Sequence, residues 1–179
     1  RCHHQSHYFH LILIFPKTET TRFIQENTDL SRILSRDRRI FPPNFSLAYQ
    51  FFDVAGYDPL YIKRYGQLVA AWEREKPDIS PAAFNRIITP MQFDNFITDL
   101  LGVKYILTQE PIQSEKLILK GKEGDTYLYE NKNVFPRVFL VENIIKAKND
   151  QEEIEKLFAL GENLRYTGIV KENIDLTKS

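Results

Sequence analysis

The stretch FDNFITDLLGVKYILT, residues 93–108, decides the fold class of this 179-residue chain. Its first part predicts a helix, which we expect to begin at Thr89 and Pro90, because apolar side chains recur there at helical spacing. These are Phe93, Phe96, Ile97, Leu100 and Leu101. Gly102 supplies the left-handed position that ends many helices. The apolar run 103–108 then predicts a buried strand, and a helix followed so closely by a strand is typical of helices packed on a sheet.

The segments before this stretch also predict short elements. We expect strands over residues 11–15 and 31–35, and a helix over residues 18–27 that Thr18 caps. Asp58 and Pro59 predict a helix start, with Asp58 as the N-cap and Pro59 in the first turn. The core face of that helix would carry Tyr61, Tyr65, Leu68, Val69 and Trp72. Ser80 and Pro81 predict a further short helix that includes Ile87 and Ile88.

The segments after it predict a hairpin and a last helix between strands. Residues 116–120 and 126–131 form the expected hairpin, residues 137–145 a longer strand, and residues 166–170 a final one. Asp150 with Glu153 predicts a capping box, and Gly161 the end of that helix. We therefore predict an α+β or α/β fold with one mixed β-sheet and about five helices. Residues 1–15 would be a tail with a possible first strand, and residues 16–179 a single domain.

Composition excludes several classes of function. Twenty-four basic residues balance 24 acidic ones, so nothing electrostatic favours nucleic acid as a partner. The only cysteine, Cys2, and all four histidines lie in residues 1–10, so a Ser–His or Cys–His nucleophile pair is excluded from the rest. We interpret that cluster as a frayed or non-native terminus, with incidental metal affinity as the alternative, and expect no metal site and no cofactor. The longest apolar run is too short to span a bilayer.

Three groups of residues remain candidates for chemistry, each with a structural alternative. Asp53 and Asp58 could share acid and base roles, or could hold a turn and cap a helix. Four arginines that lie close together in the sequence could bind a phosphate or an anionic lipid, or could form a solvated surface paired with acidic residues. They are Arg32, Arg36, Arg38 and Arg39. An aromatic stretch could line a sugar-binding cleft or fill the core. It consists of Tyr49, Phe51, Phe52, Tyr57, Tyr61 and Tyr65.

Four segments, in this order, resemble one family. Residues 41–44 (FPPN) and 53–61 (DVAGYDPLY) are similar to the extracytoplasmic region of the YfhO-like bacterial multi-pass membrane proteins of the glycosyltransferase C type. Residues 100–108 (LLGVKYILT) resemble that family's strand entry. The pair YEN (129–131) and PRVFLV (136–141) resembles a later segment. Before these segments, residues 16–27 fit the Pro-x-Thr helix that opens the family's domain. The likeness therefore spans about residues 16–172, and the His-rich N-terminus has no counterpart in it.

The resemblance implies a parent protein that moves a sugar from a polyprenyl-phosphate carrier to a cell-surface glycan. This chain would be its soluble part on the extracytoplasmic face of the bacterial cell membrane, and the absence of an initial methionine fits a fragment. The family's catalytic acidic residue lies in a loop between membrane helices, so no catalytic residue carries over. The positions that match the motifs, or that lie within the same stretch of sequence, are our candidate ligand-binding residues. They are Asp53, Gly56, Tyr57, Asp58, Pro59, Tyr61 and Arg137.

Three hypotheses follow. In the first, the domain helps to bind or position an acceptor glycan, with the rest of the parent protein and the polyprenyl-phosphate sugar as its other partners. In the second, it is a structural or interaction domain that packs on membrane helices or partner proteins and has no ligand of its own. In the third, it is a free-standing hydrolase, which requires Asp53 and Asp58 to converge in an open cleft.

Overall fold

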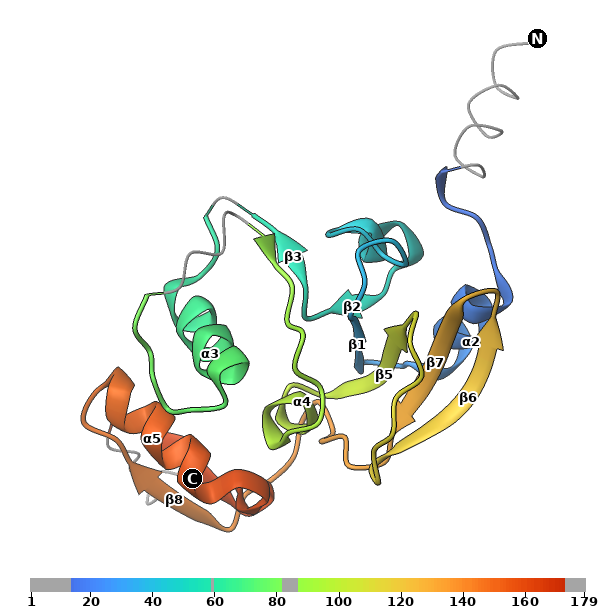
Figure 1. The fold of residues 1–179 in the computed structure, drawn as a ribbon. Helices are drawn as coiled ribbons and strands as arrows, with labels where there is room; N and C mark the ends of the chain where they lie inside the picture. The colour runs from blue at the N-terminus through green and yellow to red at the C-terminus, as the bar shows by residue number, and fades with distance from the viewer. Residues whose placement is uncertain (1–13, 59, 82–86, 173–179) are drawn as a thin grey trace, which may run out of the picture.

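The centre of the molecule is a five-stranded mixed sheet. The computed structural model describes residues 14–58, 60–81 and 87–172. The strand order is β2-β1-β5-β7-β6 (Figure 1). The strands are β1 (Arg32–Ser35), β2 (Phe52–Asp53), β5 (Val103–Thr108), β6 (Leu117–Glu123) and β7 (Thr126–Asn131). The first three run parallel, whereas β7 pairs antiparallel with both β5 and β6. The predicted α+β class and mixed sheet are confirmed.

Helices cover both faces of this sheet. They are α2 (Glu19–Asn27), the 3₁₀ helix η1 (Phe45–Tyr49), α3 (Lys63–Arg74) and α4 (Phe96–Leu100). On β5, Tyr105 and Leu107 belong to the core cluster with Ile24 of α2. Ile106, between them, belongs to the cluster with Trp72 of α3. Because both faces of β5 are buried, its sequence is a continuous apolar run rather than an alternating one.

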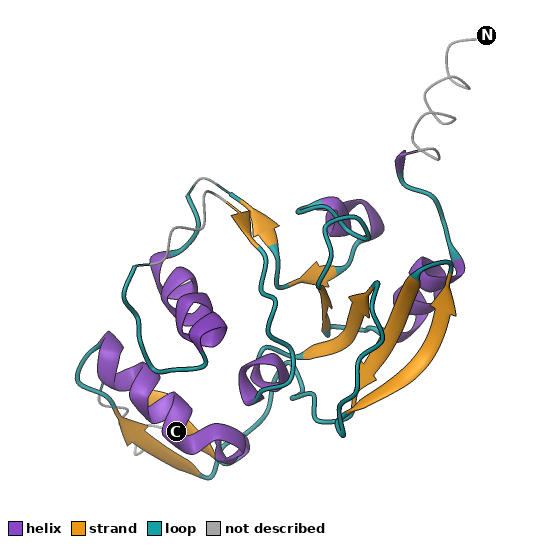
Figure 2. Ribbon diagram, viewed as in Figure 1, coloured by secondary structure: helices purple, strands orange, loops and turns teal. Residues whose placement is uncertain are grey.

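A smaller unit follows the sheet along the chain. It consists of β8 (Asn143–Lys146), α5 (Asp150–Leu160), the 3₁₀ helix η2 (Gly161–Arg165) and β9 (Thr167–Val170). The two strands pair in parallel, with α5 as the crossover (Figure 2). Phe96 of α4 packs edge-on against Phe158 of α5 at 5.3 Å between ring centroids, which joins this unit to the main body. A third, antiparallel pair consists of β3 (Gly56–Tyr57) and β4 (Ile87–Ile88).

Local capping signals placed several elements correctly. Thr18 accepts from the backbone N–H of Thr21 and caps α2 as predicted. Gly102 takes φ +69° between α4 and β5. The hairpin is confirmed with a tighter turn than expected, since β6 and β7 leave only Gly124 and Asp125 between them.

Other predicted starts were wrong. Asp58 does not cap a helix: its Oδ1 accepts from the N–H of Leu60 at 2.7 Å, and α3 begins only at Lys63. Asp58 therefore closes a local turn, and Ile62, the residue before α3, has an extended backbone. The helix expected from Thr89 and Pro90 begins at Phe96, because the Asn95 side chain caps it.

Three further predictions changed in the tertiary context. Ile87 and Ile88 form a strand instead of a helix, because they pair with Gly56 and Tyr57, while residues 82–86 lie outside the described residues. The strand expected over residues 137–145 is confined to β8, where β9 offers a partner. Of the first expected strand, residues 11–13 lie outside the described residues, and Ile14 and Phe15 are not in a strand.

The described helices were compared with the length and hydropathy that a bilayer requires. None of them is both long enough and apolar enough to cross a membrane.

Candidate functional site

One pocket collects most of the candidate residues. It has a volume of about 410 Å³ and is lined by Asp53, Gly56, Asp58 and Tyr61, which the sequence singled out, and by Arg32 and Tyr65. We call it the Asp53 pocket. Its walls come from the start of β1, the end of β2, β3 and the segment that leads into α3. Residues far apart in the sequence therefore meet at the edge of the sheet where β1 and β2 pair.

Backbone contacts hold the polar side chains of this pocket. The Arg32 Nη1 donates to the carbonyl oxygen of Leu101 at 2.6 Å. The Tyr65 hydroxyl donates to the carbonyl oxygen of Val54. The Asp53 Oδ1 accepts from the backbone N–H of Ala55 at 2.8 Å. A guanidinium, a phenol and a carboxyl group are thus fixed in one cavity, each by a bond to the chain.

Burial shifts the proton equilibria of these groups. It raises the pKa of Asp53 to about 6, although hydrogen bonds from Ala55 and Ser46 act in the opposite direction. Burial, and then the neighbouring Asp53 charge, raise the pKa of Tyr65, so its hydroxyl keeps its proton. Burial, and then the charge of Arg137, lower the pKa of Arg32. The pocket therefore contains a carboxyl group that titrates near neutral pH beside a cation that makes no ion pair with any described residue.

Of the remaining candidate residues, Tyr57 and Arg137 are not among those that line this pocket. Tyr57 is exposed, and its backbone N–H and carbonyl oxygen bind the Asn44 side chain at 3.0 and 2.9 Å. The Arg137 guanidinium lies 5.2 Å from the centroid of the Phe52 ring. Pro59 lies outside the described residues. Asn44 thus links residues 41–44 to residues 53–61, the two parts of one family-like segment.

The structure divides the two larger candidate groups. Of the aromatic stretch, Tyr49 and Phe51 are buried in the core, whereas Tyr61 and Tyr65 reach the Asp53 pocket. Of the four arginines, Arg39 pairs with Asp37 at 2.6 Å on the surface, while Arg32 alone lines this pocket. Sequence proximity had grouped arginines that the fold separates.

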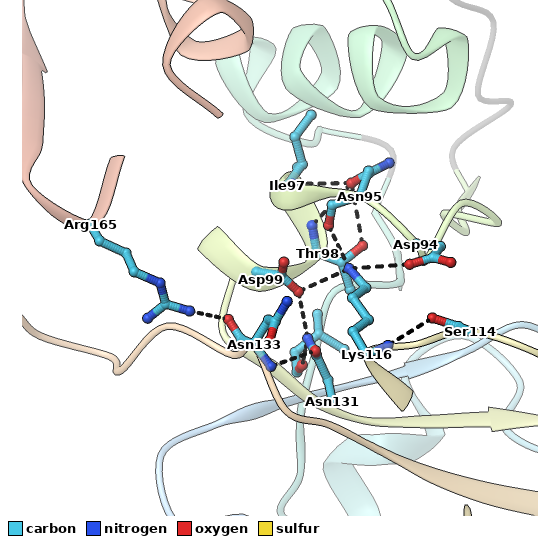
Figure 3. Close-up of polar contacts among 11 residues, drawn as sticks. Asp94, Asn95, Ile97, Thr98, Asp99, Ser114, Lys116, Asn131, Asn133 and Arg165 are labelled. Atoms are coloured by element: carbon cyan, nitrogen blue, oxygen red, sulfur yellow. Dashed lines mark hydrogen bonds and ion pairs between the residues drawn. The ribbon is translucent and has the colours of Figure 1, made fainter. Parts of the chain in front are cut away.

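A second polar cluster was missed by the sequence reasoning. Asp99 of α4 accepts from the Lys116 Nζ at 3.0 Å and from the Asn131 Nδ2 at 2.7 Å, and all three residues are buried (Figure 3). The Lys116 Nζ also donates to the carbonyl oxygen of Asn95 at 2.9 Å. Their polar atoms satisfy one another, so this cluster fastens α4 to the β6–β7 hairpin instead of presenting groups to a ligand.

No metal centre is present among the described residues, where no three His, Cys, Asp or Glu side chains are grouped to hold an ion. The interpretation of Cys2, His3, His4, His7 and His10 concerns residues outside the described part of the chain.

Comparisons with protein-family models, with curated proteins and with solved structures find no significant match to this chain.

Proposed function

We propose that this chain is an extracytoplasmic domain of a membrane glycosyltransferase-like protein and that the Asp53 pocket binds or positions an acceptor glycan. The observation that supports this is the gathering of Asp53, Gly56, Asp58 and Tyr61 in one cavity. All four belong to the segment that resembles the YfhO-like family.

The chemistry of the pocket suits a sugar. Tyrosine rings such as those of Tyr61 and Tyr65 offer apolar faces to the C–H groups of a pyranose. Asp53 and Arg32 can accept from and donate to hydroxyl groups, which fixes the orientation of the ligand. The volume of about 410 Å³ falls within the range of roughly 300–1,000 Å³ that is usual for small-ligand sites.

The sugar-transfer step itself belongs to the parent protein in this proposal. The catalytic carboxylate and the polyprenyl-phosphate sugar lie in its membrane part, on the extracytoplasmic side. This domain contributes affinity for the acceptor, and needs no cofactor for that role.

A structural role is the second candidate, and one observation favours it. Leu60 and Ile62, at the rim of the Asp53 pocket, are 86% and 73% exposed. Large exposed aliphatic side chains are common where a membrane helix or a partner protein is contacted. In that case substitutions at Asp53, Tyr57 or Arg137 lower folding stability and leave glycan affinity unchanged.

Titration of the full chain with polyprenol-linked and cell-surface glycans, followed by NMR, separates the two candidates. We expect chemical-shift changes at the Asp53 pocket and a loss of about five- to tenfold in affinity for Tyr61→Ala, because a stacked ring contributes about 1 kcal/mol. Tyr166→Ala is the matched control, since it removes an exposed ring that does not line this pocket.

The proposal fails if no such glycan shifts the resonances of the pocket in a chain that melts normally. A Tyr61→Ala chain that melts earlier than the wild type, when neither of them binds glycan, would favour the structural role.

A further inference from the structure

We infer that Arg32 and Arg137 form a paired guanidinium site for a phosphoryl group on the ligand of the Asp53 pocket. The inference rests on the proposed function, since it concerns the same pocket, but it makes a separate claim about the charge of the ligand. The sequence grouped Arg32 with neighbouring arginines as a possible phosphate contact, whereas its partner here is Arg137, which is distant along the chain.

Both arginines are neighbours of Phe52 in the fold. Arg32 lines the Asp53 pocket, and its register partner across the β1–β2 pair is Phe52. The Arg137 guanidinium lies over the ring of that same Phe52, 5.2 Å from the centroid. The segment that carries Arg137 also runs beside Arg32. A β-carbon at Gly102 would lie 3.5 Å from the carbonyl oxygen of Phe135 and 4.0 Å from the Arg32 Nη1.

Both guanidiniums have unused donors. A guanidinium carries five N–H donors, and Arg32 uses one nitrogen, for the Leu101 carbonyl oxygen. Arg137 makes neither a hydrogen bond nor an ion pair with any described residue. Arg39, Arg64 and Arg74 are each paired with an acidic side chain, but other arginines, such as Arg22 and Arg165, also have no acidic partner among the described residues. Arginines held without a counter-charge near one another are arranged for an anion that comes from outside.

The acidic side chains of the pocket do not neutralise this pair. Asp53 accepts from Ala55 and Ser46, and its burial favours the uncharged form. Asp58 is exposed and accepts from the N–H of Leu60. Neither lies within ion-pair distance of Arg32 or Arg137. The Arg137 charge lowers the pKa of Arg32, so the two cations repel each other, and an anion between them would relieve that repulsion.

A phosphoryl group fits two guanidiniums better than a carboxylate does. A planar carboxylate is satisfied by one bidentate arginine, whereas the tetrahedral oxygens of a phosphoryl group accept from two directions. Such a group can belong to a soluble sugar phosphate or to a phospholipid headgroup, and the experiment has to distinguish these sources.

Calorimetric and NMR titrations of the full chain at fixed ionic strength test the inference. The probes are inorganic phosphate, glucose 1-phosphate and methyl glucoside, together with phosphatidylcholine vesicles with and without phosphatidic acid. We expect glucose 1-phosphate to bind about tenfold or more tightly than methyl glucoside, because its phosphoryl oxygens accept charge-assisted hydrogen bonds that the glucoside cannot make. Arg137→Gln, which removes the contact with the Phe52 ring but no hydrogen bond or ion pair within the described part of the chain, should remove most of that advantage.

Two further variants test the need for a guanidinium group and control for the loss of charge. Arg32→Lys retains the charge but loses the planar fork, and should also weaken phosphate binding. Arg22→Gln removes the same charge from the exposed face of α2 and should change nothing. Thermal melting of each variant checks that the chain is folded.

The outcomes separate this inference from the proposed function. Equal affinity for glucose 1-phosphate and methyl glucoside overturns the phosphoryl site and leaves the glycan site standing. Phosphate binding that depends on Arg137 without any contribution from the sugar supports the phosphoryl site and counts against the glycan. Binding only to vesicles with phosphatidic acid, and only with Arg137 present, assigns the phosphoryl group to a lipid. Phosphate binding unchanged in both Arg32→Lys and Arg137→Gln contradicts the inference.

Discussion

Asp53 shows how much of a residue's chemistry comes from its surroundings. The sequence predicted that its carboxyl group would hold the turn, and the bond from the Ala55 N–H at 2.8 Å confirms this. Its proton affinity, however, comes from burial against β1 and α3, which no local pattern encodes. The same carboxyl group is therefore both a turn residue and a group that titrates near neutral pH.

Asp53→Asn should change the pH dependence of stability. The pKa of this carboxyl group is about 6 in the folded chain, against an ordinary value of 3.8, which we take for the unfolded chain. Below pH 3.8 both states are protonated, so Asp53 contributes nothing. Between these values the unfolded chain ionises first, so wild-type stability falls as pH rises, by about 1–3 kcal/mol in total.

The asparagine variant lacks this loss and can still accept from Ala55. Its free energy of unfolding is measured in urea from pH 4 to 7. The difference from the wild type, in favour of the variant, should therefore grow up to about pH 6 and stay constant above it. Curves that stay parallel over the whole range would contradict the raised pKa.

At the scale of single elements, caps decided where helices begin. The sequence predicted that Asp150 and Glu153 would start the last helix, but the Asn149 side chain accepts from the Glu152 N–H and caps α5. Asp150 instead pairs with Lys171. Asparagine and aspartate are almost equally good caps, so propensity could not choose between neighbours. Which of the two residues caps α5 depends on where β8 ends.

Asn149→Ala should lower the free energy of unfolding by about 1 kcal/mol, because one N–H group at the start of α5 loses its acceptor. Asn149→Ser retains a capping oxygen and should cost much less. Urea denaturation monitored by circular dichroism compares the two. Equal losses for alanine and serine would show that the cap contributes little.

At the scale of the whole molecule, the buried Asp99 cluster joins parts that local contacts do not join. Asp99 belongs to α4, whereas Lys116 and Asn131 lie together at the open end of the hairpin. Lys116 is 9% exposed and Asp99 3% exposed, so their charges have little water to solvate them. The pair is stabilising only while both partners are present.

Asp99→Ala should lower the free energy of unfolding by about 3–5 kcal/mol, since it leaves the Lys116 ammonium buried without its main counter-charge. Asp94→Ala is the matched control. Its carboxylate is half-exposed and lies 3.9 Å from the same ammonium, so it should cost less than about 1 kcal/mol. Denaturant midpoints provide the measurement, and similar losses for the two variants would contradict the assignment.

Prediction from the sequence succeeded where a signal was local and complete. The Thr18 cap, the Gly102 turn and the apolar run of β5 each lie within a few residues, and each was confirmed. It failed for the segment before β8, where an apolar run predicted a strand. Leu140 in that run is 95% exposed, because no strand is available to pair with it before Asn143.

The sequence by itself determined the α+β class, the mixed sheet and most of its buried strands, because apolar spacing and backbone preferences act over a few residues. Its composition also excluded a histidine-based nucleophile pair from residues 11–179. Only the tertiary structure decided which polar groups meet. The Asp53 pocket, the contact of Arg137 with the Phe52 ring, and the Asp99–Lys116 pair all join residues distant along the chain. Their proton affinities and partners depend on burial and on proximity in space, and neither can be read from the spacing of residues along the sequence.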